Sequence, residues 1–267
     1  MLNIPSGDAI IFAEEHGSGP PLVLLHPFPA NRRFWQPVLP QLAQRYRVLT
    51  PDLRGSGEST AGEGPATMAK HAADIDRLCT AAGVKKAVFA GVSIGGYVLF
   101  EFWRRHAERV AGLVFCDTRA TPDTPEGRAA RLRSTTEVQL HGPAAFVAGM
   151  AAKLIGETTR KSRPDVVRAA MTILNESTVA GITALQLGMG ERPDSVPALK
   201  TINVPTLVLV GEEDTLTPPA DAEQMHQGIA GSQLVKVAAA GHFSPFEQPE
   251  FVGKTLRGFL DALPRWE

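Results

Sequence analysis

The chain has 267 residues, of which 43% are hydrophobic and 21% charged, a composition typical of a globular protein with a substantial buried core. Its 27 basic and 28 acidic residues give a formal net charge of -1. This balance excludes the basic stripe of a nucleic-acid binder and the polybasic patch of a membrane-surface protein.

Short apolar runs bounded by Gly, Pro or Asp predict strands along the chain. Residues 9–15 become less apolar toward their end and favour an antiparallel edge strand. The other predicted strands are almost continuously apolar, as parallel strands covered on both faces are. They are residues 21–26, 47–50, 87–92, 110–116, 206–210 and 234–237, and they alternate with helix-like segments at 67–82, 94–105, 219–228 and 249–263. This alternation predicts an α/β fold with a doubly wound, mostly parallel sheet.

One region interrupts the alternation. Between about residues 118 and 195 no strand is evident, and four amphipathic stretches predict helices at 124–138, 143–155, 164–175 and 179–189. An insertion of this length is too long for a loop. A purely structural helical layer is one interpretation, but we favour a cap over the substrate pocket. The predicted domains are therefore a core of residues 1–117 and 196–267 and a helical cap of residues 118–195.

The cysteines and the N-terminus bear on compartment. Cys79 and Cys116 lie far apart in apolar segments, which favours two buried free thiols over a disulfide, and no Cys/His spacing resembles a zinc site. The first residues lack a basic start and a long apolar run, and no apolar stretch approaches the roughly 20 residues that span a bilayer. We therefore expect a soluble, cytoplasmic protein.

The strongest motif is GVSIGG at residues 91–96. It follows a predicted strand and opens a predicted helix, which is the context that a G-x-S-x-G nucleophile elbow requires. A sharp turn strains the backbone of Ser93, and the glycines around it remove side chains that would clash. The bare pattern also occurs by chance in unrelated chains, but this context predicts Ser93 as a nucleophile.

A serine hydroxyl needs a neighbouring general base, normally a histidine. Of the seven histidines, His242 follows the last predicted strand, and open α/β sheets carry their sites in loops at the carboxyl ends of strands. His26 also ends a predicted strand, and we interpret it as structural. The others lie in polar or helical surroundings. His242 is therefore the predicted base.

The histidine needs a carboxylate that fixes its tautomer. Asp214, in the segment GEEDTLTP, follows the predicted strand 206–210. Asp117 competes with it, because it follows the predicted strand 110–116. The Gly-x-x-Asp turn followed by Thr-Pro fits a catalytic loop better, so Asp214 is the predicted acid. Glu212 and Glu213 are expected to be solvated.

Acyl transfer also needs backbone N–H groups aimed at the developing oxyanion. Ile94, directly after the nucleophile, is the first expected donor. The second should come from HPFP at residues 26–29, where proline has no N–H and Phe28 is the only donor among residues 27–29. The alternative interpretation is a proline-rich surface turn.

The segment DLRGSG at residues 52–57 resembles a phosphate-binding loop, but it lacks the Lys-Ser/Thr ending that would hold phosphate and metal. We expect a structural turn in which Asp52 and Arg54 tie loops together.

These motifs, together with AGHFSPFEQP at residues 240–249, agree in order with one superfamily. Over essentially its whole length the chain resembles α/β-hydrolases, in particular the bacterial group of 3-oxoadipate enol-lactonases, carboxylesterases and acyl-homoserine-lactone lactonases. The resemblance implies a sheet of about eight strands, with Ser93 as nucleophile, Asp214 as acid, His242 as base, and Phe28 and Ile94 as oxyanion donors. The chain departs from the family where His26-Pro27 replaces the usual His-Gly.

We therefore expect a serine hydrolase that acts on a small, largely apolar and uncharged carboxylic ester or lactone in an apolar pocket. We expect no cofactor and no metal, no nucleic-acid or membrane partner, and a monomer or homodimer. A perhydrolase or a C–C bond hydrolase working with the same triad is the alternative. A hydrolase-fold protein that only binds a ligand is the third hypothesis, and the intact triad disfavours it.

Overall fold

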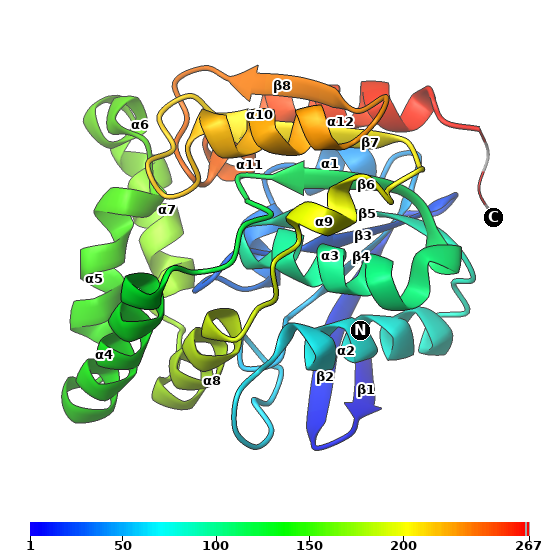
Figure 1. The fold of residues 1–267 in the computed structure, drawn as a ribbon. Coiled ribbons are helices and arrows are strands. Elements are labelled where there is room, and N and C mark those ends of the chain that lie inside the picture. Colours follow the sequence, from blue (N-terminus) through cyan, green and yellow to red (C-terminus); the bar gives the residue numbers. More distant parts are fainter. Residues whose placement is uncertain (265, 267) are drawn as a thin grey trace.

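A mixed β-sheet forms the centre of the protein (Figure 1). The computed structural model describes residues 1–264 and 266, and within them the sheet has eight strands in the order β1-β2-β4-β3-β5-β6-β7-β8. All pairs from β4 through β8 in that order are parallel, which confirms the predicted fold class. The strands are β1 (Leu2–Ser6), β2 (Ala9–His16), β3 (Pro21–Leu25), β4 (Arg47–Pro51), β5 (Ala87–Val92), β6 (Val110–Cys116), β7 (Thr206–Gly211) and β8 (Gln233–Val237).

The antiparallel end of the sheet differs from the prediction in one respect. β2 was expected at the edge, but β1 lies outside it, and β2 pairs antiparallel with both β1 and β4. β1 escapes detection because its sequence, LNIPS, contains Pro5 and little apolar periodicity. A proline is tolerated in an edge strand, where one side of the backbone has no partner strand.

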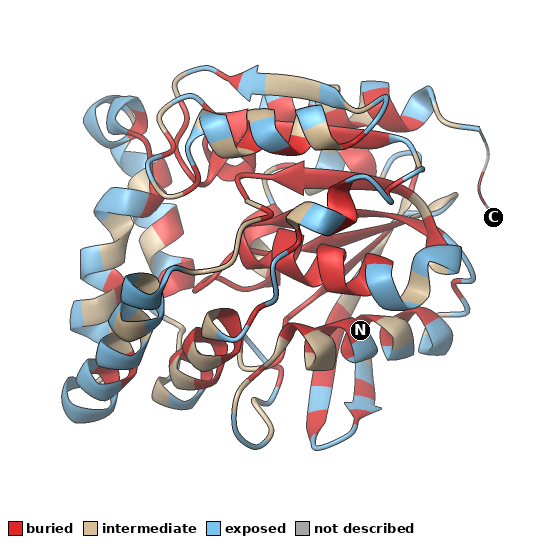
Figure 2. Ribbon diagram, viewed as in Figure 1, coloured by how far each residue is buried: buried red, intermediate tan, exposed pale blue. Residues whose placement is uncertain are grey.

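Helices cover both faces of the sheet. α2 (Met68–Ala81), α3 (Ile94–His106) and α10 (Pro219–Gly228) lie on one face, and α1 (Leu39–Leu42) packs with α12 (Pro249–Asp261) on the other (Figure 1). The inner strands β3 to β7 are almost entirely buried (Figure 2), which explains their continuous apolar runs. The short helices are η1 (Arg32–Trp35), η2 (Ala107–Arg109), α9 (Val196–Leu199) and α11 (Ser244–Glu247).

The region between β6 and β7 contains a group of helices that lies beyond the carboxyl ends of the strands (Figure 1). They are α4 (Pro125–His141), α5 (Pro143–Leu154), α6 (Glu157–Ser162), α7 (Pro164–Leu174) and α8 (Val179–Gly190). Side chains of Thr124 and Thr178 cap α4 and α8, as N-cap residues do. The four predicted helices match these within a few residues, and α6 escaped prediction because it is too short to show periodicity.

Other expectations concern the cysteines, membrane spans and metals. Cys79 and Cys116 are buried free thiols, as predicted, and burial raises the pKa of Cys79 to about 12. Within residues 1–264 and 266, no helix is long and apolar enough to cross a membrane. Over the same residues, no group of three or more His, Cys, Asp or Glu side chains is arranged to hold a metal ion.

Candidate active site

Ser93 occupies the sharp turn between β5 and α3. Its φ of 54° and ψ of −113° are a strained conformation for a residue other than glycine. The Ser93 N–H donates to the carbonyl of Cys116 at 3.0 Å, and its carbonyl accepts from the Thr118 hydroxyl at 2.7 Å. The end of β6 therefore holds the turn from both sides, and strain of this kind is found chiefly where function requires it.

The glycines of the motif permit two close backbone approaches. A Cβ atom on Gly91 would lie 2.4 Å from the backbone carbon of Gly95, so any side chain there would obstruct the turn. A Cβ atom on Gly95 would lie 2.7 Å from the carbonyl oxygen of Leu25 in β3. The motif therefore has a physical reason at both glycine positions: it lets α3 start close against β3 and β5.

His242 and Asp214 form a buried pair beside this turn. The Nδ1 atom of His242 lies 2.8 Å from Asp214 Oδ2, and both side chains are at most 3% exposed. Thr217 donates its hydroxyl to the same Oδ2 at 2.6 Å, while the N–H groups of Leu216 and Thr217 donate to Oδ1 at 2.8 and 3.0 Å. The loop after β7 thus wraps the carboxylate and fixes its direction.

The charge of Asp214 follows from these contacts. Burial raises the pKa of this carboxyl group, but the interactions with His242 and Thr217 outweigh burial and leave the pKa below its ordinary value. An ionised Asp214 accepts the Nδ1–H of His242. The Nε2 atom of the neutral ring then carries a lone pair and can accept a proton.

Asp117, the competing carboxylate, lies at the end of β6 but makes different contacts. It accepts from the Gly211 N–H at 2.8 Å and from the hydroxyl and N–H of Ser244 at 2.6 and 3.2 Å. Burial, together with the nearby charge of Asp214, holds its pKa well above the ordinary range. Asp117 thus connects β6 to β7 and to α11, whereas the carboxylate hydrogen-bonded to His242 is that of Asp214.

Of the two expected oxyanion donors, Ile94 directly follows Ser93, and Phe28 lines the same cavity as Ser93 and His242. Ile94 is the first residue of α3, and Phe28 follows β3 in a turn closed by the Ala30 N–H on the Pro27 carbonyl at 3.0 Å. Within residues 1–264 and 266, neither the Phe28 N–H nor the Ile94 N–H has a hydrogen-bond acceptor.

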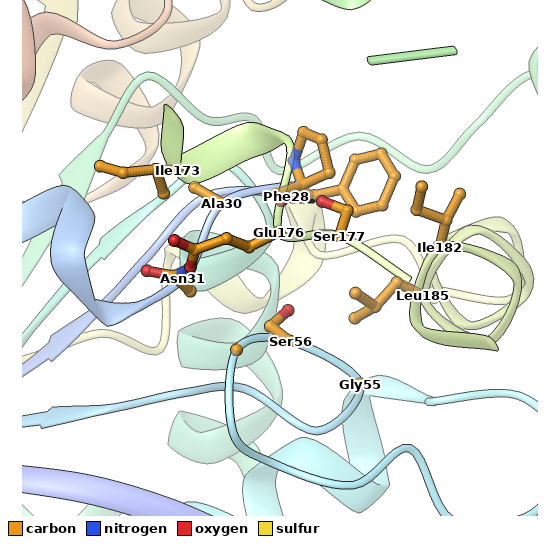
Figure 3. A pocket seen from close by; sticks show the side chains of 12 residues that line it. Phe28, Ala30, Asn31, Gly55, Ser56, Ile173, Glu176, Ser177, Ile182 and Leu185 are labelled. Carbon is orange, nitrogen blue, oxygen red and sulfur yellow. Dashed lines mark hydrogen bonds between the residues drawn. The ribbon is translucent and has the colours of Figure 1, made fainter. Parts of the chain in front are cut away.

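The segment between α7 and α8 holds the Phe28 turn from its other side. Ser177 donates its hydroxyl to the Pro29 carbonyl at 2.7 Å, and Asn31 donates to the Glu176 carboxylate at 2.7 Å. Figure 3 shows these side chains around a small cavity of about 10 Å³, with Ser56 on the opposite wall. The turn that carries Phe28 is thus fixed between the sheet and the inserted helices.

A larger cavity of about 240 Å³ opens over Ser93 and His242. This volume is just below the usual range of ligand pockets, so it suits a small substrate. Apolar side chains from the inserted helices meet polar ones there, and the lining is more polar than the sequence analysis expected. The lining residues are Phe28, Ser93, Tyr97, Arg119, Asp123, Gly127, Ala130, Arg131, Ser134, Met150, Leu154, Gln186, Met189, Leu216, Thr217 and His242.

Comparison with known proteins identifies the fold family. Residues 20–249 match the family described as alpha/beta hydrolase fold. The chain belongs to the alpha/beta-hydrolase family. An esterase from Thermogutta terrifontis, whose structure is described as malate bound, is 39% identical and covers 97% of each chain with a TM-score of 0.94.

Two further relatives of this hydrolase are enol-lactonases. The enol-lactonase of Burkholderia xenovorans LB400 is 25% identical over 96% of this chain and 98% of its own, with a TM-score of 0.89. The 3-oxoadipate enol-lactonase 1 of Acinetobacter baylyi is 26% identical and covers 92% of this chain and 90% of its own length. Esterases and lactonases are therefore among the proteins that the hydrolase resembles.

His26, Asp52 and Arg54, near the site, have the structural roles predicted from the sequence. The buried His26 accepts the Leu53 N–H at Nε2 and contacts the Pro27 carbonyl through Nδ1, both at 2.9 Å, and burial lowers its pKa. Asp52 pairs with Arg32 at 2.6 Å. Arg54 makes two 2.8 Å contacts with the carboxylate of Asp74. Asp52 thus connects its loop to η1, and Arg54 connects the same loop to α2.

Three residues of the site were not predicted from the sequence: Thr217, Glu247 and Arg131. Thr217 contacts Asp214 and also lies 3.2 Å from His242 Nδ1. The buried Glu247 accepts the N–H of Gly241, next to His242, and the N–H of Gly156 before α6, both at 2.9 Å. Thr217 lies in the segment GEEDTLTP and Glu247 in AGHFSPFEQP. A polar residue close in sequence to a predicted triad residue could have indicated their roles. Arg131 had no such signal.

Proposed function

We propose that this α/β-hydrolase cleaves a small carboxylic ester or lactone through an acyl-enzyme intermediate on Ser93. The observation that carries the proposal is that Ser93 and His242, the latter paired with Asp214, line the same cavity. The esterase and enol-lactonase relatives support the same reaction class. A serine on a strained elbow beside an oriented histidine is the arrangement that acyl transfer uses.

The first half-reaction forms the acyl-enzyme. His242 Nε2 takes the proton of the Ser93 hydroxyl while its oxygen attacks the substrate carbonyl carbon. The carbonyl oxygen becomes an oxyanion and accepts hydrogen bonds from the N–H groups of Ile94 and Phe28. The tetrahedral intermediate collapses, the bond to the leaving oxygen breaks, and the His242 imidazolium donates its proton to that oxygen.

The second half-reaction releases the acid. His242 takes a proton from water, the water oxygen attacks the ester carbon on Ser93, and collapse of the second intermediate returns the proton to the serine oxygen. In a lactone the leaving hydroxyl stays on the acyl chain and departs only at this stage. Asp214 remains ionised throughout and stabilises the imidazolium.

We further propose that residues 118–195 act as a cap over a core of residues 1–117 and 196–267. Two observations support a functional role for this insertion. It contributes Arg131, Met150 and Met189 to the cavity wall, and its residues Glu176 and Ser177 hold the turn that carries Phe28. The cap would therefore shape the substrate pocket and steady one oxyanion donor.

A kinetic panel tests the proposed reaction. The wild type should hydrolyse p-nitrophenyl esters of short acids and simple lactones, with kcat/KM falling as the acyl chain outgrows the 240 Å³ cavity. Ser93→Ala should lower kcat by about 10⁴-fold or more, because acyl-enzyme formation requires the hydroxyl. Ester turnover that survives Ser93→Ala would contradict the mechanism.

Two additions to this panel, peroxide and a dienoic diketone, separate the alternatives that use this triad. A perhydrolase would show peroxide-dependent oxidation that exceeds its ester hydrolysis. A C–C hydrolase would cleave a dienoic diketone faster than any ester.

A further inference from the structure

A cluster of charged residues forms one wall of the cavity over Ser93. Arg131 of α4 and Asp123, just before that helix, both line the cavity. Arg131 donates through Nε and Nη2 to the Asp123 carboxylate and through Nη1 to Gln186 at 2.7 Å. Arg192 approaches the other side of Asp123 with Nη1 at 2.7 Å from Oδ1. Two guanidinium groups thus share one carboxylate.

The two arginines are not equivalent. Arg192 is 4% exposed, donates to the carbonyls of Met189 and Thr121, and stacks on the ring of Tyr97 at 4.3 Å. It serves as the internal partner of Asp123. Arg131 is 21% exposed and faces the cavity. The unbalanced positive charge of the cluster is therefore presented to the substrate space by Arg131.

The rest of the lining does not cancel this charge. Asp123 is the only acidic residue among the described residues that line the cavity, and Arg119 lines it as well. Arg119 donates to the Leu216 carbonyl, but its Nε has no hydrogen-bond acceptor within the described chain, and the nearest carboxylate oxygen, on Asp221, is 3.8 Å away. A guanidinium in a partly desolvated site binds carboxylates by charge-assisted hydrogen bonds.

We propose that the physiological substrate is an anionic ester or lactone whose carboxylate is bound by Arg131, with Arg119 adding to the attraction. This inference rests on the proposed function and names its substrate class. It replaces the uncharged substrate expected from the sequence with a small molecule that carries one carboxylate besides the scissile ester. Arg131 would act as a specificity-determining residue, and Asp123 would hold its guanidinium in place.

Matched pairs of esters test the proposal. Monoethyl succinate against diethyl succinate places the charge on the acyl side, and p-acetoxybenzoate against its methyl ester places it on the alcohol side. In the wild type, kcat/KM should favour the anionic member of at least one pair. Arg131→Gln, which retains a donor toward Asp123, should lower the anionic-to-neutral ratio in that pair by about 10- to 100-fold.

The control is Arg128→Gln. Arg128 lies on the same helix and carries the same charge, but it is exposed and does not line the cavity, so its substitution should leave the ratio unchanged. Equal kcat/KM within both pairs of the wild type, or an equal fall in the ratio for both variants, would overturn the proposal. A wild type that hydrolyses none of the four esters would instead refute the proposed function.

A measurement on the wild type alone covers the case in which Arg131→Gln does not fold. Succinate should inhibit hydrolysis of the neutral ester competitively and at least about tenfold more strongly than succinamide, which has similar size without charge. Inhibition by succinate no stronger than that by succinamide would overturn the proposal.

Discussion

The choice between two buried aspartates can be tested by one pair of isosteric substitutions, Asp214→Asn and Asp117→Asn. In Asp214→Asn, the amide oxygen keeps the N–H donors of Leu216 and Thr217, so the loop retains its shape. The new amide nitrogen then faces Nδ1 of His242. Because that amide nitrogen is a hydrogen-bond donor, Nδ1 must be unprotonated and accept from it. The proton moves to Nε2, and the ring can no longer accept a proton from Ser93.

The expected loss follows from this change of tautomer. Without the base, kcat should fall by about 10³- to 10⁴-fold, which corresponds to roughly 4 to 5.5 kcal/mol of transition-state stabilisation. Asp117→Asn keeps the acceptor for the Gly211 N–H and disturbs only the contacts with Ser244. It should cost about 1–3 kcal/mol of stability and leave kcat within about tenfold of the wild type.

The assay is kcat for p-nitrophenyl butyrate near neutral pH, with the midpoint of urea unfolding measured for both variants. The two readouts separate a chemical defect from a folding defect. If Asp117→Asn loses as much kcat as Asp214→Asn while remaining folded, or if Asp214→Asn retains kcat within about tenfold, the assignment of the acid is wrong.

Three further predictions concern the surroundings of the triad and the core. Burial lowers the pKa of His71 to about 3 in the folded protein, whereas the pKa of a histidine in an unfolded chain is near 6.5. Below about pH 6.5 the unfolded state therefore binds a proton that the folded state does not, and stability is lost as the pH falls. Between about pH 7.5 and about pH 5, the free energy of unfolding of the wild type should fall by about 2 kcal/mol more than that of His71→Leu. Denaturant titrations at the two pH values measure this difference, and an equal fall in both proteins would contradict the prediction. Thr217→Val removes the 2.6 Å hydroxyl contact to the triad carboxylate and should lower kcat about tenfold with little change in unfolding midpoint, whereas an unchanged kcat would remove this residue from the site. Gly95→Ala should destabilise the protein by about 1–3 kcal/mol, because the new Cβ atom clashes with the Leu25 carbonyl. The control is Gly258→Ala, at a helical position with open space around it, which should not destabilise the protein. Similar unfolding midpoints for the two variants would contradict the prediction.

The sequence predicts those parts of the site that are local in the chain. The nucleophile elbow can be predicted because its strand, turn, glycines and helix lie within a few residues of Ser93. The choice between Asp117 and Asp214 is harder, since both follow apolar strands. It depends on which carboxylate faces His242 across adjacent strands, and that direction is fixed by the Thr217 and Ser244 contacts.

Other features escaped prediction because they depend on packing at a distance. Hydropathy indicates that residues 124–138 are helical, but not that Arg131 turns inward to Asp123 and Gln186 and adds a charged group to the cavity wall. The role of Glu247 likewise requires Gly156 and Gly241, far apart in sequence, to approach one carboxylate. The edge strand β1 was missed because its pairing with β2, rather than its own composition, makes it a strand.

The central claim is that Ser93 is the activated nucleophile, and covalent labelling tests it most directly. A fluorophosphonate probe incubated with the folded wild type should add one phosphonyl group per chain, with fluoride as the leaving group, and peptide mapping should locate the adduct on Ser93. Asp214→Asn should label far more slowly, and Ser93→Ala should not label. An adduct on another residue, or a folded wild type that never reacts, would contradict the account.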